Sequence, residues 1–426
     1  MPVYFNVGSV RLQPSLVLLL LTVIPFVIGW LCGVFGRIKL PDILVVGCCL
    51  WQATALMATD GLEASIEPIG VYATQTFGAY LLGRACIRRL EDVRYLATLI
   101  FVQAAFMLPF AVFEALTSRS IILEAFSGIL PTYGYVYKEP RLGLDQVQGT
   151  FEHPILFGIF MAFGFSLVFF RFKTNFSKIF TLPVIVINTF LSLSTGALLS
   201  IVVQAILIGW SMVFRVSTPR WRNLAILVVI TYIAIDMASN RSPAAVFVDY
   251  LTFNTGNAYN RILIWEFGTA EVWRHPFFGL GFAADWERPY WMSSSMDNFW
   301  LVAAVRYGLP NFILLAAAFI FALYLAGRAP ILDEDTVLLR RGYIMGTVGT
   351  LAAICSVHLW NFSYSWLMFA LGGVVWFIDA GKAAPTDSGG GTSDESGAVT
   401  PSDGAKIPNK PRVIIGDVRY GETPAD

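Results

Sequence analysis

The sequence predicts an all-α integral membrane protein. Of its 426 residues, 56% are hydrophobic and only 14% are charged, whereas about 25% of the residues in a soluble protein are charged. The mean hydropathy is +0.65, and apolar runs close to the roughly 20 residues that cross a bilayer as a helix recur along the chain. A chain of this composition has too little polar surface to stay dissolved, so we expect the lipid bilayer to be its solvent.

Eleven segments qualify as transmembrane helices, and the expected count is eleven to twelve. They lie at about 15–35, 42–58, 68–87, 95–116, 154–170, 178–194, 196–214, 223–239, 298–326, 341–358 and 362–380. The run at 298–326 is long and is interrupted at Gly308 and Pro310. It predicts either one kinked helix or a short re-entrant piece followed by a span.

Lysine and arginine in the connecting loops predict the orientation, because cytoplasmic loops carry an excess of both. One alternating set of loops holds fifteen basic residues. The other set holds seven, although it contains the two longest loops, 117–153 and 240–297. The first set is therefore expected in the cytoplasm, which places the C-terminus inside. Both long loops then lie outside, and the larger one connects the eighth and ninth spans.

The chain is expected to form one membrane domain followed by a tail. The domain covers residues 1–380 and includes both long loops, whose Trp, Tyr, Phe and Arg content favours ordered structure. Within the larger loop, residues 259–274 have the pattern of an interfacial helix. Residues 381–426 are rich in Gly, Ser, Asp and Pro, so they predict a disordered cytoplasmic tail.

Several classes of protein are excluded by what the chain lacks. Its five cysteines form no CxxC pair and its three histidines are far apart, so neither a disulfide framework nor a metal site is expected. The formal net charge is zero and no dense basic run occurs, so nucleic acid is not an expected partner.

Charged side chains concentrate between residues 261 and 310. Such groups, gathered against an apolar domain, typically mark a substrate site. They are Arg261, Glu266, Glu271, Arg274, His275, Asp285, Glu287, Arg288, Asp297 and Arg306.

Motifs in and before this region resemble those of the bacterial O-antigen ligase and polysaccharide polymerase family. The likeness covers roughly residues 140–325 and depends on the order and spacing of the motifs. They are Gly149-Thr150-Phe151-Glu152-His153-Pro154 with Phe157-Gly158, Ser192-Leu193-Ser194-Thr195-Gly196-Ala197, Arg261-x3-Trp265, His275-Pro276-x2-Gly279-x-Gly281, Asn298-x2-Leu301 and Gly308.

The resemblance implies a glycosyltransferase of the bacterial inner membrane. Proteins of this family transfer glycan from a polyprenyl diphosphate carrier to an acceptor at the periplasmic face, without a metal or another cofactor. The implied partners are the bilayer, the lipid-linked oligosaccharide and other proteins of envelope polysaccharide assembly. Two positions depart from the family pattern: Thr195 stands in place of an arginine, and Asp297 in place of a histidine.

Four arginines are candidates for binding the diphosphate, because a guanidinium group grips phosphate oxygens in pairs and keeps its charge. Arg261 leads on its motif position, and Arg141, Arg288 and Arg306 follow. For the first three, the alternative is a side chain that anchors its segment at the membrane interface. Arg306 lies inside an apolar run, where a buried salt bridge is an equally good interpretation.

The acceptor hydroxyl needs a base, for which Asp297, Glu152, His275 and Glu266 are candidates. Asp297 takes the position of the family histidine, and a desolvated carboxylate there can accept a proton. Its alternative role is the N-cap of the helix that follows. His275 precedes a proline, and a histidine in such a turn more often stabilises the turn than acts as a catalyst.

Trp265 and Asn298 complete the expected substrate-binding residues. Both occupy family motif positions. Trp265 offers a flat face to a sugar or an isoprenoid, although an aromatic belt at the membrane interface produces the same composition.

Two other functions remain open at this point. One is a transporter or flippase for a lipid-linked glycan or a small anion, although transporters generally show repeated halves and charged pairs within spans. The other is a relative that keeps the family fold without its activity, which the departures at Thr195 and Asp297 leave open.

Overall fold

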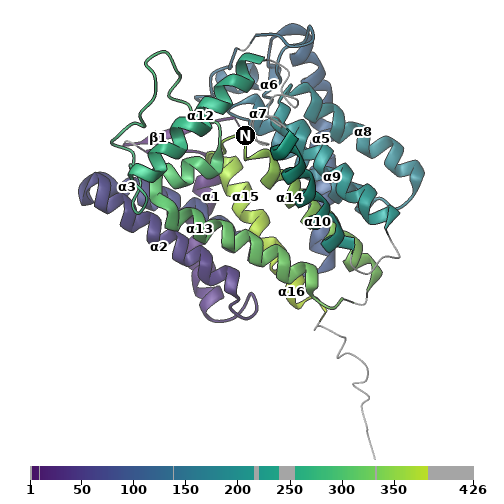
Figure 1. Ribbon diagram of the computed structural model, residues 1–426. Coiled ribbons are helices and arrows are strands. Elements are labelled where there is room, and N and C mark those ends of the chain that lie inside the picture. The colour runs from purple at the N-terminus through teal and green to yellow at the C-terminus, as the bar shows by residue number, and fades with distance from the viewer. Residues whose placement is uncertain are drawn as a thin grey trace, which may run out of the picture. The chain divides into compact units, whose positions relative to one another are not determined.

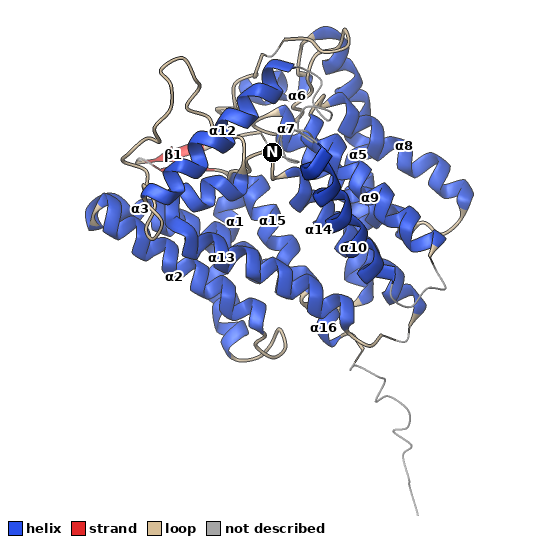
Figure 2. Ribbon diagram, in the orientation of Figure 1, coloured by secondary structure: helices blue, strands red, loops and turns tan. Residues whose placement is uncertain are grey.

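The computed structural model describes residues 2–8, 10–137, 139–214, 220–238, 255–331 and 333–381. All of them belong to one compact unit, Met1–Ala383. Helices make up most of this unit (Figure 2), so the predicted helical class is confirmed. The predicted disordered tail lies outside the described residues.

The described helices follow one another along the chain, and the long connections 128–153 and 275–298 lie between some of them (Figure 1). They are α1 (Pro14–Leu31), α2 (Leu40–Asp60), α3 (Leu62–Ala73), the π-helix η1 (Thr74–Gly78), α4 (Ala79–Cys86), α5 (Leu90–Thr117), α6 (Ile121–Ser127), α7 (Pro154–Arg171), α8 (Asn175–Leu191), α9 (Thr195–Val213), α10 (Arg220–Ala238), α12 (Thr255–Arg274), α13 (Phe299–Arg328), α14 (Glu334–Ala353), α15 (Asn361–Val374) and α16 (Trp376–Asp379). Two three-residue strands, β1 (Phe5–Val7) and β2 (Val10–Leu12), form an antiparallel hairpin that the sequence did not predict.

Helices overlap all eleven expected segments. Among the described residues, eight are long and apolar enough to cross a membrane: α1, α2, α5, α7, α9, α10, α13 and the combined Asn361–Asp379. The other expected segments correspond to α8, which has 17 residues, to α14, which is less apolar, and to the helix that η1 divides. The chain therefore has the helices of a multi-pass membrane protein, and the count of eleven spans stays a prediction.

The most enclosed candidate span is α7, which packs against α5, α8, α9 and α14. On the other side of the domain α2 packs along α13, and α4 packs along α15. Helix α10 has no buried residue. Helix α12, where the interfacial helix was predicted, packs on the first half of α13 through Leu263 and Ile264.

Helix α13 consists of two helical pieces joined at Gly308, and the choice between a kinked span and a re-entrant piece followed by a span stays a prediction. Gly308 has φ +82° and ψ 169°, far from helical values. The break frees the carbonyl oxygens of Val305 and Arg306, which accept hydrogen bonds from the N–H groups of Leu280 (2.8 Å) and Gly281 (3.0 Å). The His275–Gly281 motif is thereby attached to α13 through the backbone.

Gly308→Ala is expected to destabilise the protein by at least about 2 kcal/mol, because an L-residue at this φ is strained. In addition, a Cβ atom would lie 1.8 Å from the carbonyl oxygen of Phe277. The measurement is the thermal unfolding midpoint of the purified protein in detergent. Gly209→Ala is the control, since Gly209 lies within α9 with nothing within 4 Å of its Cβ position. Equal midpoints for the two variants would contradict the prediction.

Candidate functional site

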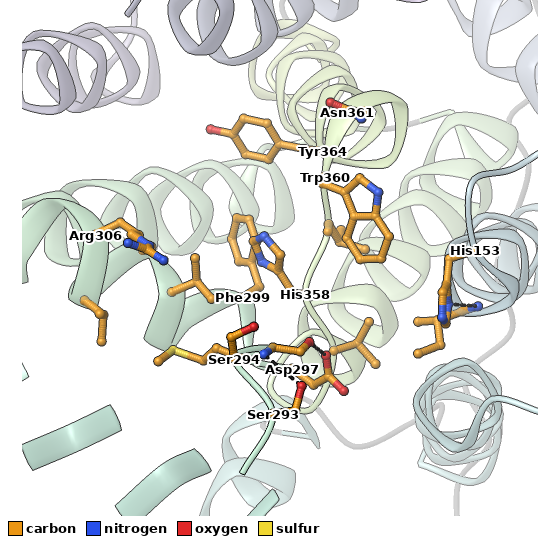
Figure 3. Close-up of a pocket in the computed structure, with 18 of the residues that line it drawn as sticks. His153, Ser293, Ser294, Asp297, Phe299, Arg306, His358, Trp360, Asn361 and Tyr364 are labelled. Carbon is orange, nitrogen blue, oxygen red and sulfur yellow. Dashed lines mark hydrogen bonds between the residues drawn. The ribbon is translucent and has the colours of Figure 1, made fainter. Parts of the chain in front are cut away.

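A cavity of about 880 Å³ opens among the connections at one end of the helices. Residues 139–155, the turn before α9, the start of α12, residues 282–297 and residues 357–361 all contribute to its walls. These connections are the ones that the distribution of basic residues places on a single side of the membrane. Figure 3 shows side chains from several of these segments facing one another across the cavity.

Two arginines converge on the turn before α9. Arg141 Nη1 donates to the carbonyl oxygen of Leu193 (2.7 Å), and Arg261 Nη2 donates to Thr195 Oγ1 (3.1 Å). Burial lowers the pKa of both guanidinium groups; for Arg261, Asp297 opposes that effect and the charge of Arg141 adds to it. Two like charges held this close repel each other, and an anion between them would relieve the repulsion.

Thr195 stands at the position where the resemblance implies an arginine. The structure places the guanidinium group of Arg261 on its hydroxyl. The positive charge at this turn is therefore supplied from α12, so the departure at Thr195 does not remove it.

Asp297 lines the cavity and accepts a hydrogen bond from Ser295 Oγ (2.9 Å). Its charge acts on both Arg261 and His358. Helix α13 begins at Phe299 with Asn298 as its N-cap, whose side chain accepts from the N–H of Leu301 (3.0 Å). The interpretation of Asp297 as the N-cap is therefore wrong, and Asn298 is a buried cap outside the cavity wall.

His358 is the principal site residue that the sequence did not single out. The expected span at 341–358 ends earlier, because α14 stops at Ala353, so His358 lies in the connection to α15. Its ring stacks between Phe299 and Trp360, with centroids 6.2 and 6.0 Å away. In Figure 3 it lies between these two residues in the cavity. The sequence did contain a signal for His358. The predicted topology puts the short connection before α15 on the same side of the membrane as the two long loops.

The imidazole of His358 is neutral at pH 7. Burial lowers its pKa from 6.5 to about 4, the charge of Asp297 acts to raise it and that of Arg306 to lower it. Its Nδ1 atom is enclosed and has no hydrogen-bond partner among the described residues. A neutral imidazole in a cavity beside a carboxylate has the capacity to accept a proton.

Arg306 lines the cavity and also holds one of its walls. Its Nη1 donates to the carbonyl oxygens of Gly281 and Ala284, both at 2.8 Å. From the other side, the carboxylate of Asp60 at the end of α2 accepts from the N–H of Phe282 at 2.8 Å. The alternative interpretation of Arg306 from the sequence was a buried salt bridge. Among the described residues, its guanidinium group instead bonds to carbonyl oxygens.

Glu152 lies outside the cavity wall and is half-buried. Its carboxylate accepts hydrogen bonds from the amide of Asn361 (2.8 and 3.0 Å) and from the amide of Gln13. Asn361 itself lines the cavity. Glu152 therefore ties the N-terminal segment to the start of α15, and this geometry favours a structural role over that of a base.

His275, Glu266 and Trp265 also lie away from the cavity. His275 follows the last turn of α12, with Nε2 3.4 Å from a carboxylate oxygen of Glu271. This position agrees with the alternative of a histidine that stabilises a turn. Glu266 is exposed, and the side chain of Trp265 is 54% exposed, which suits an aromatic residue at a membrane interface.

Arg288 is engaged within its own loop. Its Nη1 donates to Asp285 (2.7 Å) and to the carbonyl oxygen of Trp286 (3.0 Å), and its Nε donates to the carbonyl oxygen of Met292 (3.3 Å). It does not line the cavity, and it stiffens the segment that places Trp286 there. Trp286 is buried, lines the cavity and donates from Nε1 to the carbonyl oxygen of Ser294 (3.1 Å).

Nothing in the described part of the chain points to a metal centre. No group of three or more His, Cys, Asp or Glu side chains there is placed to hold a metal ion. A metal-independent reaction stays a prediction from the sequence. Comparisons with protein-family models and with the sequences of curated proteins find no match to this chain, so the family resemblance of its motifs also stays a prediction.

Proposed function

We propose that the protein is a membrane glycosyltransferase that transfers glycan from a polyprenyl diphosphate carrier to an acceptor hydroxyl. The observation that carries this proposal is the convergence of Arg141 and Arg261 on one turn, inside a cavity that also holds Asp297 and His358. Clustered guanidinium groups can bind the oxygens of a diphosphate, and a neutral imidazole can accept the proton of the acceptor hydroxyl.

The leaving diphosphate defines the role of the two arginines. When the bond between the anomeric carbon and the carrier oxygen breaks, the diphosphate takes the electron pair and gains negative charge. Fixed cations aimed at that charge lower the barrier, because the site is arranged before the reaction begins. Arg261 and Arg141 are the residues we assign to this role.

The acceptor hydroxyl loses its proton as its oxygen attacks the anomeric carbon. We assign the proton to the imidazole of His358, which is neutral at pH 7 and whose Nδ1 atom has no hydrogen-bond partner among the described residues. Asp297 then stabilises the imidazolium by its negative charge. This assignment moves the base from Asp297, the leading candidate from sequence, to a neighbour on a different connection.

The proposal includes the orientation of the chain. We place it in the bacterial inner membrane with eleven spans, the cavity at the periplasmic face and the C-terminus in the cytoplasm. In support, the connections that line the cavity are those poor in lysine and arginine. This placement requires the lipid-linked oligosaccharide as substrate. It favours other proteins of envelope polysaccharide assembly as partners.

The test is mass analysis of surface glycans and carrier-linked intermediates from a strain that lacks the gene. Loss of a polymerase leaves single repeat units on the carrier, and loss of a ligase leaves long chains that are not attached to an acceptor. Either result supports the proposal and identifies the product. Carrier-linked units held on the cytoplasmic side would contradict it, because they indicate a flippase.

A further inference from the structure

The part of the cavity that lies between the helices is lined by apolar residues, by Arg306 and by a group of neutral polar side chains. These polar side chains are Gln52 of α2, Tyr72 of α3, Gln75 of η1, Tyr307 of α13 and Tyr364 of α15, and we call them the polar floor. Gln52 lies eight residues before the end of α2, or about 12 Å into the helix at 1.5 Å per residue. Polar groups at such depth are costly unless they are hydrogen-bonded.

Close contacts make a network of the polar floor and its neighbours. Tyr364 Oη lies 2.7 Å from Thr76 Oγ1. The rings of Tyr72 and Tyr307 pack edge to face, with centroids 5.9 Å apart. The Gln52 Oε1 atom is enclosed and has no hydrogen-bond partner among the described residues. The network therefore has hydrogen-bonding capacity that the protein itself does not use.

The π-helix η1 contributes to this arrangement. It interrupts the helical segment Leu62–Cys86 with five residues, Thr74–Gly78, of which Gln75 lines the cavity and Thr76 bonds to Tyr364. π-Helical turns are rare and occur frequently at functional sites. Here the irregular turn directs two neighbouring polar side chains toward the same network.

The polar floor differs in charge from the rest of the cavity. Arg141, Arg261 and Asp297 line the part formed by the connections, whereas the polar floor contains only amides and phenols. In Figure 3 the hydroxyl group of Tyr364 points away from both Asp297 and His358. One cavity thus offers Arg141 and Arg261 to one portion of a ligand. To another portion it offers neutral hydrogen-bonding groups beside Arg306, whose guanidinium group bonds to the carbonyl oxygens of Gly281 and Ala284.

We propose that the polar floor binds the hydroxyl groups of a sugar, the neutral portion of the glycan whose diphosphate lies at Arg141 and Arg261. This inference rests on the proposed function. Rotation about the terminal torsion of Gln52, which is a soft one, lets Oε1 accept a bond from a sugar hydroxyl.

The test uses the full chain in detergent and two probes. One is the saccharide released by mild acid from the carrier lipids of the producing cells, and the other is inorganic pyrophosphate. Gln52→Leu is expected to weaken saccharide binding about tenfold, as the loss of one hydrogen bond does, and to leave pyrophosphate binding unchanged. Its unfolding midpoint should not fall, because leucine replaces a side chain whose enclosed oxygen atom has no hydrogen-bond partner among the described residues.

Gln103→Leu is the matched control, because Gln103 is exposed on α5 and does not line the cavity. It should bind both probes as the wild type does. If Gln52→Leu lowers the unfolding midpoint, Gln75→Leu takes its place with the same expected tenfold loss.

Three outcomes decide the matter. Saccharide binding equal to wild type in the floor variants would overturn the polar floor as a sugar site. So would a wild-type protein that binds pyrophosphate but no saccharide, and in both cases the proposed function would stand. A wild-type protein that does not bind pyrophosphate would overturn the proposed function itself.

Discussion

Arg261→Ala is expected to lower glycan transfer at least about 100-fold while the amount of protein in the membrane stays unchanged. The variant removes a guanidinium group that faces the leaving diphosphate, and loss of one such preorganised donor costs about 10²–10³ in rate. Arg261→Lys should be intermediate, because lysine keeps the charge and loses the planar fork. The measurement is product formed per unit of enzyme from purified lipid-linked substrate.

Arg119→Ala is the control for this experiment. Arg119 pairs with Glu124 on an exposed part of the chain and does not line the cavity, so its loss should leave the rate close to wild type. Near-normal product from Arg261→Ala would remove the central role that we assign to this residue.

His358→Gln is expected to reduce the rate about 100-fold at pH 7, since a positioned base commonly contributes 10²–10⁴. Glutamine keeps a polar group of similar length and cannot take up a proton at this pH. The measurement is kcat/KM with saturating acceptor from pH 7.5 down to about pH 3, for the wild type and the variant.

The same residue predicts the shape of the pH profile. A base must be neutral to act, and burial lowers the pKa of His358 to about 4. The wild-type rate should therefore stay level from pH 7 to about 5 and fall as the imidazole becomes protonated below that. Asp297 raises this pKa, so Asp297→Asn should move the fall to lower pH. A full rate in His358→Gln, or an acid limb near pH 6.5, would refute the assignment.

Much of the helical architecture could be predicted because bilayer-spanning helices are a local property of the sequence. Each needs only a run of apolar residues, and the runs at 15–35 and 95–116 coincide with α1 and α5. The break in α13 was also visible at Gly308 and Pro310. The sequence did not show which groups bond to the carbonyl oxygens that the break frees. Their partners are N–H groups of a motif more than twenty residues away.

The structure brings some of the expected site residues to one cavity and places the others around it. Arg141, Arg261, Arg306 and Asp297 line the cavity as expected for a common site. Glu152, His275 and Asn298 come from the motifs, and Arg288 from the same charged region. They cap, tie or stiffen the segments around the cavity, and the motif residue Trp265 is exposed away from it. A motif shows which residues act together, and it does not distinguish those that face a ligand from those that hold the backbone.

The sequence by itself determined the membrane class, the position of most helices and the side of the membrane on which the polar connections are expected. These predictions follow from apolar runs and from the count of basic residues in each loop. Both are local properties of the sequence, because each depends only on residues that are close together along the chain. Only the tertiary structure brought His358 beside Asp297 and placed Gln52, Gln75 and Tyr364 around one cavity. Those residues lie on helices and connections far apart in the chain. Their proximity depends on how the helices pack, which no local pattern encodes.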